Sequence, residues 1–269
     1  MGQQGYAFIS GIGGLNDQVN LYYRDSAHAN AIISYESDTA PTNITALLDL
    51  LNRRGSQGWA YKGDLAMGVN DARSVFVKDS TRASTYAYNA PVGTTLDWAG
   101  LLAQLNERGS AGERFIGPVT YGASANAPVY NPYMRAAAWP VTYSYSSAGQ
   151  PANGTSADAF QTMLAAHGQN RRVLVGAYVP GGNPMTPALL FETSSAQTST
   201  LDYQVIPTPA SESTASQVQR HNAKAQEGYV HLGDYAINAA AIGPAAFMSI
   251  YVKGLQFPLR QPLAGIVYP

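Results

Sequence analysis

The chain has 269 residues and a formal net charge of −1, from 16 basic and 17 acidic side chains, so its charge favours neither nucleic acid nor an anionic membrane as a partner. Only 12% of the residues are charged, whereas 18 are tyrosine and 26 are glycine, a composition suited to assemblies, extracellular proteins and particle shells. The lack of cysteine excludes disulfides, thiolate metal sites and a cysteine nucleophile.

The N-terminal sequence Met-Gly-Gln-Gln-Gly has neither a basic region nor a long apolar stretch. These features predict synthesis in the cytoplasm without a secretory signal peptide. The longest apolar run, residues 237–250, is interrupted by Gly243 and Pro244, which predicts no membrane insertion.

Alternating apolar residues, turn residues and cap residues divide the chain into similar units. The expected strands, in chain order, are 6–12, 19–24, 31–36, 59–66, 74–78, 85–89, 115–121, 139–146, 172–179, 188–192, 201–206, 229–237 and 247–253. The expected helices are 44–54, 96–108, 157–167 and 214–226, each preceded by proline and by Ser, Thr or Asn cap candidates. A Pro- and Asn-rich connection is expected at 123–132 and a tail without a helix at 257–268.

An internal duplication is the strongest signal in the chain. Residues 47–68 and 101–122 are identical at ten of 22 positions without a gap, and weaker copies of this helix and strand follow at 164–176 and 222–233. The sequence therefore predicts an α+β fold of four to five pseudo-symmetric β-β-α-β repeats with antiparallel or mixed sheets. The whole chain is expected to form one body with units at 18–68, 73–122, 133–180, 187–238 and 246–269 plus 5–13.

The order and number of these modules resemble the pentein fold, a five-bladed α/β propeller. This resemblance implies a propeller-like ring in which strand 6–12 completes the last module. Because the catalytic penteins use a cysteine nucleophile and this chain has none, the resemblance implies a non-catalytic member, like the ribosome-binding translation factor that shares the fold. Residues 51–59, with the pattern LNxxGxxGW, also resemble a small bacterial domain of unknown function, which implies no particular chemistry.

Catalytic and metal-binding patterns are sparse in the sequence. No GxSxG motif or metal-ligand spacing occurs, so no cofactor and no metal are expected. We expect the histidines to serve mainly structural roles, with His221 at the position of Leu51 in the repeat. Asp64 and Asp234 each follow a glycine that recurs in the repeat, Gly63 and Gly233. In a closed ring of units these two residues would converge as catalytic carboxylates. Solvation of strand ends is the alternative interpretation of these two residues.

Tyrosines recur on the strands that precede the helices. They could form an aromatic face for glycans or protein partners, or they could be ordinary cross-strand pairs covered by helices. The six candidates are Tyr35, Tyr86, Tyr88, Tyr143, Tyr145 and Tyr203.

Three functions are compatible with these features. The first is a non-enzymatic structural or binding protein that self-associates or joins other proteins of an assembly, with a phage or other virus particle as the setting. The second is a glycan- or protein-binding module that uses the tyrosines. The third is a cysteine-independent hydrolase with a central site at Asp64 and Asp234.

Overall fold

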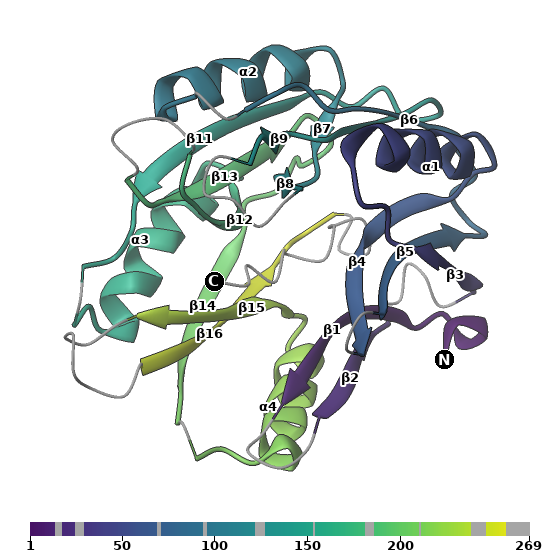
Figure 1. The fold of residues 1–269 in the computed structure, drawn as a ribbon. Coiled ribbons are helices and arrows are strands. Elements are labelled where there is room, and N and C mark those ends of the chain that lie inside the picture. The colour runs from purple at the N-terminus through teal and green to yellow at the C-terminus, as the bar shows by residue number, and fades with distance from the viewer. Residues whose placement is uncertain are drawn as a thin grey trace.

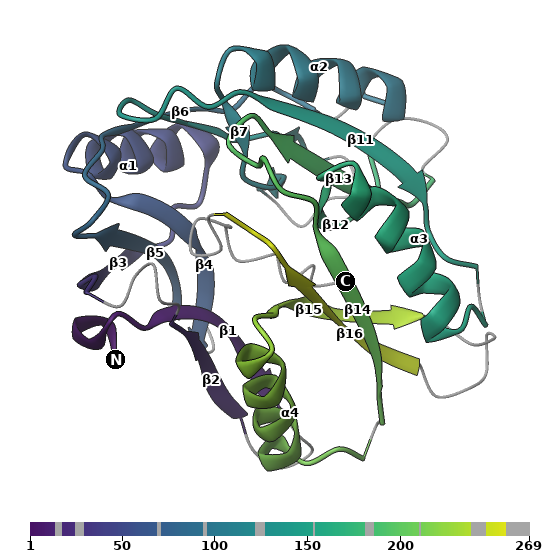
Figure 2. The ribbon, with the colours of Figure 1, turned by 180° about the vertical axis from the view of Figure 1, so that it is seen from behind.

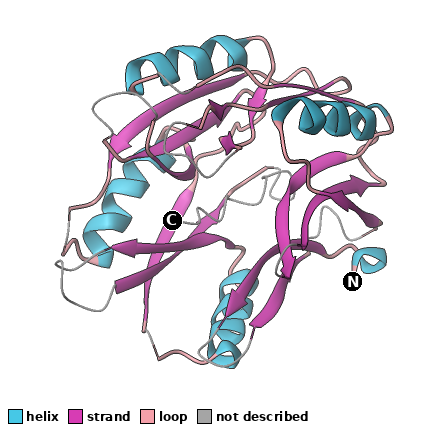
Figure 3. Ribbon diagram, viewed as in Figure 1, coloured by secondary structure: helices cyan, strands magenta, loops and turns pink. Residues whose placement is uncertain are grey.

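The computed structural model describes residues 1–13, 18–24, 30–68, 71–93, 96–121, 127–152, 154–180, 186–209, 211–237 and 246–256. In these residues the chain forms four α-helices, a short 3-10 helix (η1, Gly2–Gln4) and sixteen strands in six small antiparallel sheets. Each α-helix stands between groups of strands along the chain (Figure 3). The α+β class expected from the sequence is confirmed.

Four helices of equal length mark the repeats. They are α1 (Ile44–Ser56), α2 (Trp98–Ser110), α3 (Ala157–Gln169) and α4 (Thr214–Gln226), each of 13 residues. Each begins at a residue whose side-chain oxygen accepts a backbone N–H three positions later, which satisfies one free donor of the first turn. These N-cap residues are Asn43, Asp97, Ser156 and Ser213.

Each helix connects the two outer strands of a three-stranded sheet, and a later strand of the same unit lies between them. The four sheets are β3 (Ile33–Thr39), β5 (Asp71–Asp79) and β4 (Ala60–Gly68); β6 (Tyr86–Asn89), β10 (Tyr133–Ala136) and β7 (Arg114–Phe115); β11 (Tyr143–Gly149), β13 (Ala188–Ser194) and β12 (Val173–Tyr178); and β14 (Asp202–Thr208), β16 (Ala246–Lys253) and β15 (Val230–Ile237). Two smaller sheets are β1 (Ala7–Gly13) with β2 (Gln18–Tyr23), and β8 (Val119–Thr120) with β9 (Val129–Tyr130).

The unit that forms a sheet starts one strand later than the sequence predicts. The predicted unit 18–68 joins β2 to β3 and β4, but β2 pairs with β1, and β3 and β4 pair with β5. Each sheet-forming unit is therefore β-α-β-β. The strand β1, expected to complete the last module, pairs only with β2 in the described residues. Within those residues the sheets do not join into a closed barrel or propeller.

Two local expectations of the third unit differ from the structure. The predicted strand 115–121 is divided into β7 and β8, because Gly117 has a φ of 104° and Pro118 has no N–H for a strand ladder. The connection expected at 123–132 contains β9, and β10 follows it where no strand was predicted. The whole tail 257–268 lies outside the described residues, as does His28.

The helices lie at the rim of the molecule and pack on the sheet of the following unit (Figures 1 and 2). Helix α1 packs on β6, α2 on β11, and α3 on β14. The apolar core is therefore shared between units: one buried cluster combines Leu47 and Leu51 of α1 with Phe76 of β5 and Tyr88 of β6. In the part of the chain that the structure describes, helix α4 is followed by no further three-stranded sheet, and it lies near β2 and β15.

Candidate functional site

The two candidate carboxylates are each bonded to a serine on the neighbouring strand. The Ser74 hydroxyl donates to Asp64 Oδ1 at 2.6 Å, and the Ser249 hydroxyl donates to Asp234 Oδ1. Both serines are fully buried, and each is the register partner of its aspartate. In the third unit the equivalent pair is Ala177 and Leu189, so the aspartate and the serine are absent together.

This paired occurrence supports a role for both aspartates in cross-strand hydrogen bonding. Among the described residues, no hydrogen bond or ion pair joins Asp64 to Asp234, which lie in different sheets. The shared central site therefore receives no support from these contacts.

A cluster of polar side chains replaces the apolar core in the last unit. In the first unit, Leu51 of α1 lies in the same cluster as Phe76, and the register pairs Tyr61 with Phe76. The corresponding positions are Leu105, Phe115 and Tyr133 in the second unit and Leu164, Leu174 and Phe191 in the third. In the fourth they are His221, His231 and Tyr251.

The histidines of this cluster contact each other and charged neighbours. Their ring centroids are 4.3 Å apart, and both residues are at least 93% shielded from solvent, with exposures of 6% and 7%. The Nδ1 atom of His221 lies 2.9 Å from the Tyr251 hydroxyl, which also accepts a hydrogen bond from Arg220. The Nε2 atom of His231 lies 3.1 Å from Asp234 Oδ1, while its Nδ1 is buried and has no hydrogen-bond partner among the described residues.

Burial controls protonation in this cluster. Burial, followed by the charges of His231 and Arg220, lowers the pKa of His221 to about 3. Burial alone would raise the pKa of Asp234, but its hydrogen bonds with His231 and Ser249 lower it to about 2. Near neutral pH, His221 is therefore neutral and Asp234 is ionised. No group of three or more His, Asp or Glu side chains in the described part of the chain is arranged to hold a metal ion.

The low pKa of His221 predicts a loss of stability in acid. Between pH 6.5 and about 3, the unfolded chain binds a proton at this residue that the folded protein excludes, so stability falls as pH falls. The slope from this group is at most about 1.4 kcal/mol per pH unit. His221→Leu restores the residue of the other units and should flatten the profile, as measured by urea unfolding between pH 7 and 5. Equal slopes for both proteins would refute this assignment.

The tyrosines of the outer strands connect neighbouring sheets. The hydroxyls of Tyr88, Tyr145 and Tyr203 accept backbone N–H groups of Tyr61, Phe115 and Leu174 at 2.8 to 2.9 Å. Tyr35 does the same for Phe8 at 2.6 Å.

Burial divides the six tyrosine candidates into two groups. Tyr88, Tyr145 and Tyr203 are buried, so their rings are covered by the fold and are not presented to a ligand. Tyr35, Tyr86 and Tyr143 are half-buried. The six residues therefore do not form one exposed aromatic face, and ligand binding by the half-buried rings stays a prediction.

An asparagine in the helix binds the backbone of the strand that covers it. Asn52 Oδ1 accepts the Tyr88 N–H at 2.8 Å, and Asn52 Nδ2 donates to the Tyr88 carbonyl at 3.1 Å. Asn106 binds Tyr145 in the same way at 2.7 and 3.1 Å. Asn222 holds the equivalent position of α4, is exposed, and makes no side-chain hydrogen bond to the described residues.

The sequence analysis missed the polar cluster and the strand-binding role of the recurring asparagine. Asn52, Asn106 and Asn222 do recur in the repeat, so alignment of the copies contains the signal. The alignment does not show that, in the described residues, α4 lacks the packing on a following strand that α1, α2 and α3 have.

The sequence pattern of one protein family, described as PT dipeptide repeat lipoprotein, matches residues 1–240. The chain belongs to this family. No curated protein and no solved structure matches the chain. The family description carries no statement about a pentein fold, about the LNxxGxxGW pattern or about a virus particle.

Membership of this family corrects the predicted localisation. A lipoprotein is made with a signal peptide and carries a lipid anchor, which conflicts with the expectation of cytoplasmic synthesis without a signal peptide. The expectation was wrong because it rested on the composition of the first residues alone. In the described residues, no helix combines the length and apolar character needed to cross a membrane.

Proposed function

We propose that this lipoprotein-family protein is a non-enzymatic binding protein that joins a larger assembly by self-association through the face of α4 that carries Asn222, to which no described strand is hydrogen-bonded. The observation that carries the proposal is Asn222, which repeats the strand-binding asparagines of α1 and α2 without a strand to bind in the described residues. The unpaired edge of a sheet is a recurring site of strand addition.

The adjacent sheet also has room for a strand. The centre strands β5, β10, β13 and β16 each pair on both sides, whereas β2 pairs only with β1 among the described strands. Helix α4 lies near β2, in the views of both Figure 1 and Figure 2. In addition, no tyrosine hydroxyl of the described residues reaches the N–H of His231, which corresponds to the N–H of Tyr61 in the first unit.

The chain contains a segment with the pattern of the missing strand. A hydrophobic residue, any residue and tyrosine occur in this order at the start of the outer strand that precedes each helix, namely Ile33-Ser34-Tyr35, Tyr86-Ala87-Tyr88, Tyr143-Ser144-Tyr145 and Leu201-Asp202-Tyr203. After β16, the same pattern occurs at residues 266–268, Ile-Val-Tyr, which lie outside the described residues. In our proposal, a strand with this sequence pattern from a second copy binds the face of α4 that carries Asn222.

Replacement of the helix glycine by alanine in α4 predicts that a strand bound there lies further from the helix than the strands bound to α1, α2 and α3. Gly55, Gly109 and Gly168 let a strand carbonyl approach the helix, but α4 carries Ala225 at this position. The added methyl group keeps an incoming strand further from α4, which favours reversible association. A lipid anchor, as the family description implies, would concentrate copies at a membrane surface and promote such association.

The test is the mass of the protein by light scattering over a concentration series. We expect concentration-dependent oligomers, and we expect Asn222→Ala to weaken association about tenfold or more, because two hydrogen bonds of about 1 kcal/mol each are lost. Gln219→Ala removes another exposed amide of α4 and serves as the matched control.

A synthetic peptide of residues 262–269 should inhibit association, and the same peptide with Tyr268→Ala should not. A wild-type protein that is monomeric at all concentrations contradicts self-association. Unchanged association of Asn222→Ala contradicts the assignment of the α4 face.

A further inference from the structure

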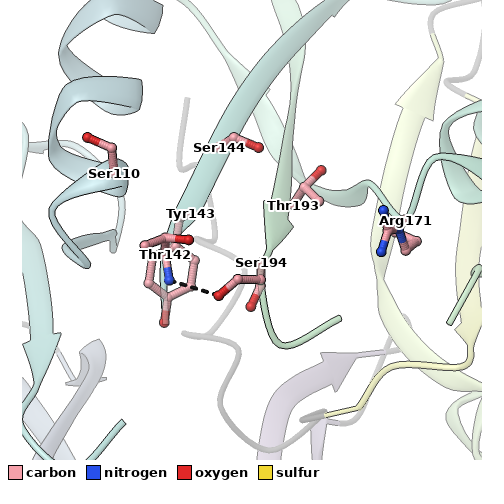
Figure 4. A pocket seen from close by; sticks show the side chains of 8 residues that line it. Ser110, Thr142, Tyr143, Ser144, Arg171, Thr193 and Ser194 are labelled. Carbon is pink, nitrogen blue, oxygen red and sulfur yellow. Dashed lines mark hydrogen bonds between the residues drawn. The ribbon is translucent and has the colours of Figure 1, made fainter. Parts of the chain in front are cut away.

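A polar pocket of about 340 Å³ lies where the end of α2, the strands β11 and β13, and the turn after α3 meet (Figure 4). Tyr143 and Arg171 contribute to its lining, and the remaining side chains all carry hydroxyl groups. These are Ser110, Thr142, Ser144, Thr193, Ser194 and Ser195. In Figure 4, Ser110 and Arg171 stand at opposite ends of the row, with the side chains of β11 and β13 between them.

The pocket exists in this unit because a long basic side chain is absent from the centre strand. In the first unit this position is Lys78, whose Nζ donates to the carbonyl of Gln57 at the end of α1 at 3.0 Å. The equivalent residues of the second and fourth units are Arg135 and Lys253. The third unit has Thr193 instead, a short hydroxyl side chain that leaves the space above β13 open.

In the third unit the basic side chain lies in the turn after α3, as Arg171, and not on the centre strand. In the other three units the turn after the helix contains a glycine with φ between 82° and 89°, namely Gly58, Gly112 or Gly228. In the third unit this position holds Arg171, the one non-glycine residue of the described chain with positive φ, at 59°. A left-handed conformation is unfavourable for a residue with a Cβ atom, and such conformations concentrate at functional sites.

The Arg171 guanidinium is available for a ligand. Unlike Lys78, it makes no hydrogen bond or ion pair to any described residue, and Arg171 is exposed at the pocket. A guanidinium binds carboxylates and sulfates through two parallel hydrogen bonds. Hydroxyl side chains both donate and accept, which matches the hydroxyls of a sugar ring, and Tyr143 adds an aromatic surface.

We propose that this pocket binds an acidic saccharide, with its carboxylate or sulfate on Arg171 and its hydroxyls on the serines and threonines. The site includes Tyr143, one of the six tyrosines for which the sequence predicts ligand binding. The proposal is independent of self-association through α4, because the pocket belongs to the second and third units.

Titration calorimetry with three probes tests the proposal: a uronic-acid oligosaccharide, a neutral oligosaccharide of the same length and linkage, and inorganic sulfate. We expect the wild type to bind the uronic-acid probe at least tenfold more tightly than the neutral one. Arg171→Gly should bind both with equal affinity, while its thermal midpoint stays the same or rises, because glycine adopts the left-handed conformation readily.

Two further variants complete the test. Thr193→Lys restores the side chain of the first and fourth units, fills the pocket and should abolish binding of both oligosaccharides. Arg53→Ala removes one exposed charge remote from the pocket and should leave every affinity unchanged. The proposal is overturned if the wild type binds neither oligosaccharide at millimolar concentration, if it binds sulfate alone, or if Arg171→Gly retains the preference for the acidic probe.

Discussion

Replacing Arg114 with methionine is expected to lower the free energy of unfolding by about 3–5 kcal/mol, because it leaves the Glu192 carboxylate buried without its partner. The Nε atom of Arg114 lies 3.0 and 2.9 Å from the two carboxylate oxygens of Glu192. Both residues are buried, with exposures of 6% and 4%. Arg114 lies on β7 and Glu192 on β13, so the pair joins the sheets of the second and third units.

The surrounding groups increase the cost of breaking this pair. The Tyr145 hydroxyl donates to Glu192 at 3.0 Å and also accepts the Phe115 N–H, so loss of the pair disturbs a tyrosine link between sheets. Burial opposes the charge of Arg114, but Glu192 holds its pKa above the usual value. Burial of Lys62, followed by the charge of Arg114, lowers the pKa of Lys62 to about 8.

A double-mutant cycle separates the pair from the cost of an unpaired charge. Glu192→Gln should destabilise the protein by a similar amount, whereas Arg114→Met combined with Glu192→Met should cost less than the sum of the single changes. Urea unfolding at pH 7 gives all values. Single substitutions that each cost less than about 1 kcal/mol would show that the pair is solvated in solution.

Gly109→Ala is expected to cost about 3 kcal/mol, because a Cβ atom at this position has no space. An ideal Cβ on Gly109 lies 2.3 Å from the Tyr143 carbonyl oxygen, a backbone atom of the strand that covers α2. Gly55 and Gly168 have the same relation, at 2.2 and 2.3 Å, to the carbonyls of Tyr86 and Leu201. The change therefore forces the helix away from the strand and weakens the Asn106 hydrogen bonds to Tyr145.

The fourth unit supplies the control for this prediction. Ala225 holds the equivalent position in α4 and is exposed, so Ala225→Gly should cost only about 0.5–1 kcal/mol from helix propensity. Thermal or urea unfolding of both variants provides the comparison. A loss of less than 1 kcal/mol for Gly109→Ala would mean that the helix moves without cost, which the close packing of the cluster around Leu105 opposes.

Local structure could be predicted well from the sequence because caps and periodicity act over a few residues. The observed bounds of α4, Thr214–Gln226, equal the predicted ones, and the helix α1 begins at the predicted residue. Strand pairing could not be predicted in the same way. Alternation shows which residues share a face, but it does not identify the neighbouring strand, so the central position of β5 between β3 and β4 was missed.

The candidate site shows the same division. The recurrence of Asp64 and Asp234 after the repeat glycine was correctly identified, but their serine partners lie on another strand and were not. The polar replacement at His221 was visible as a substitution for leucine, and only the fold shows that His231 and Tyr251 join it. Sequence patterns therefore located unusual residues but not their contacts.

Packing of each helix on the next sheet has a consequence for how the protein unfolds. The helices α1, α2 and α3 each bury their apolar face against the following unit, so the core of each of these units includes residues of its neighbour. A single unit is therefore not expected to fold when it is separated from the others. The stability of each unit should then depend on its contacts with the adjacent units, as in linear repeat arrays, and unfolding should begin at the two ends of the chain. Hydrogen exchange is expected to be slowest in the second and third units and fastest in the hairpin β1–β2 and in α4.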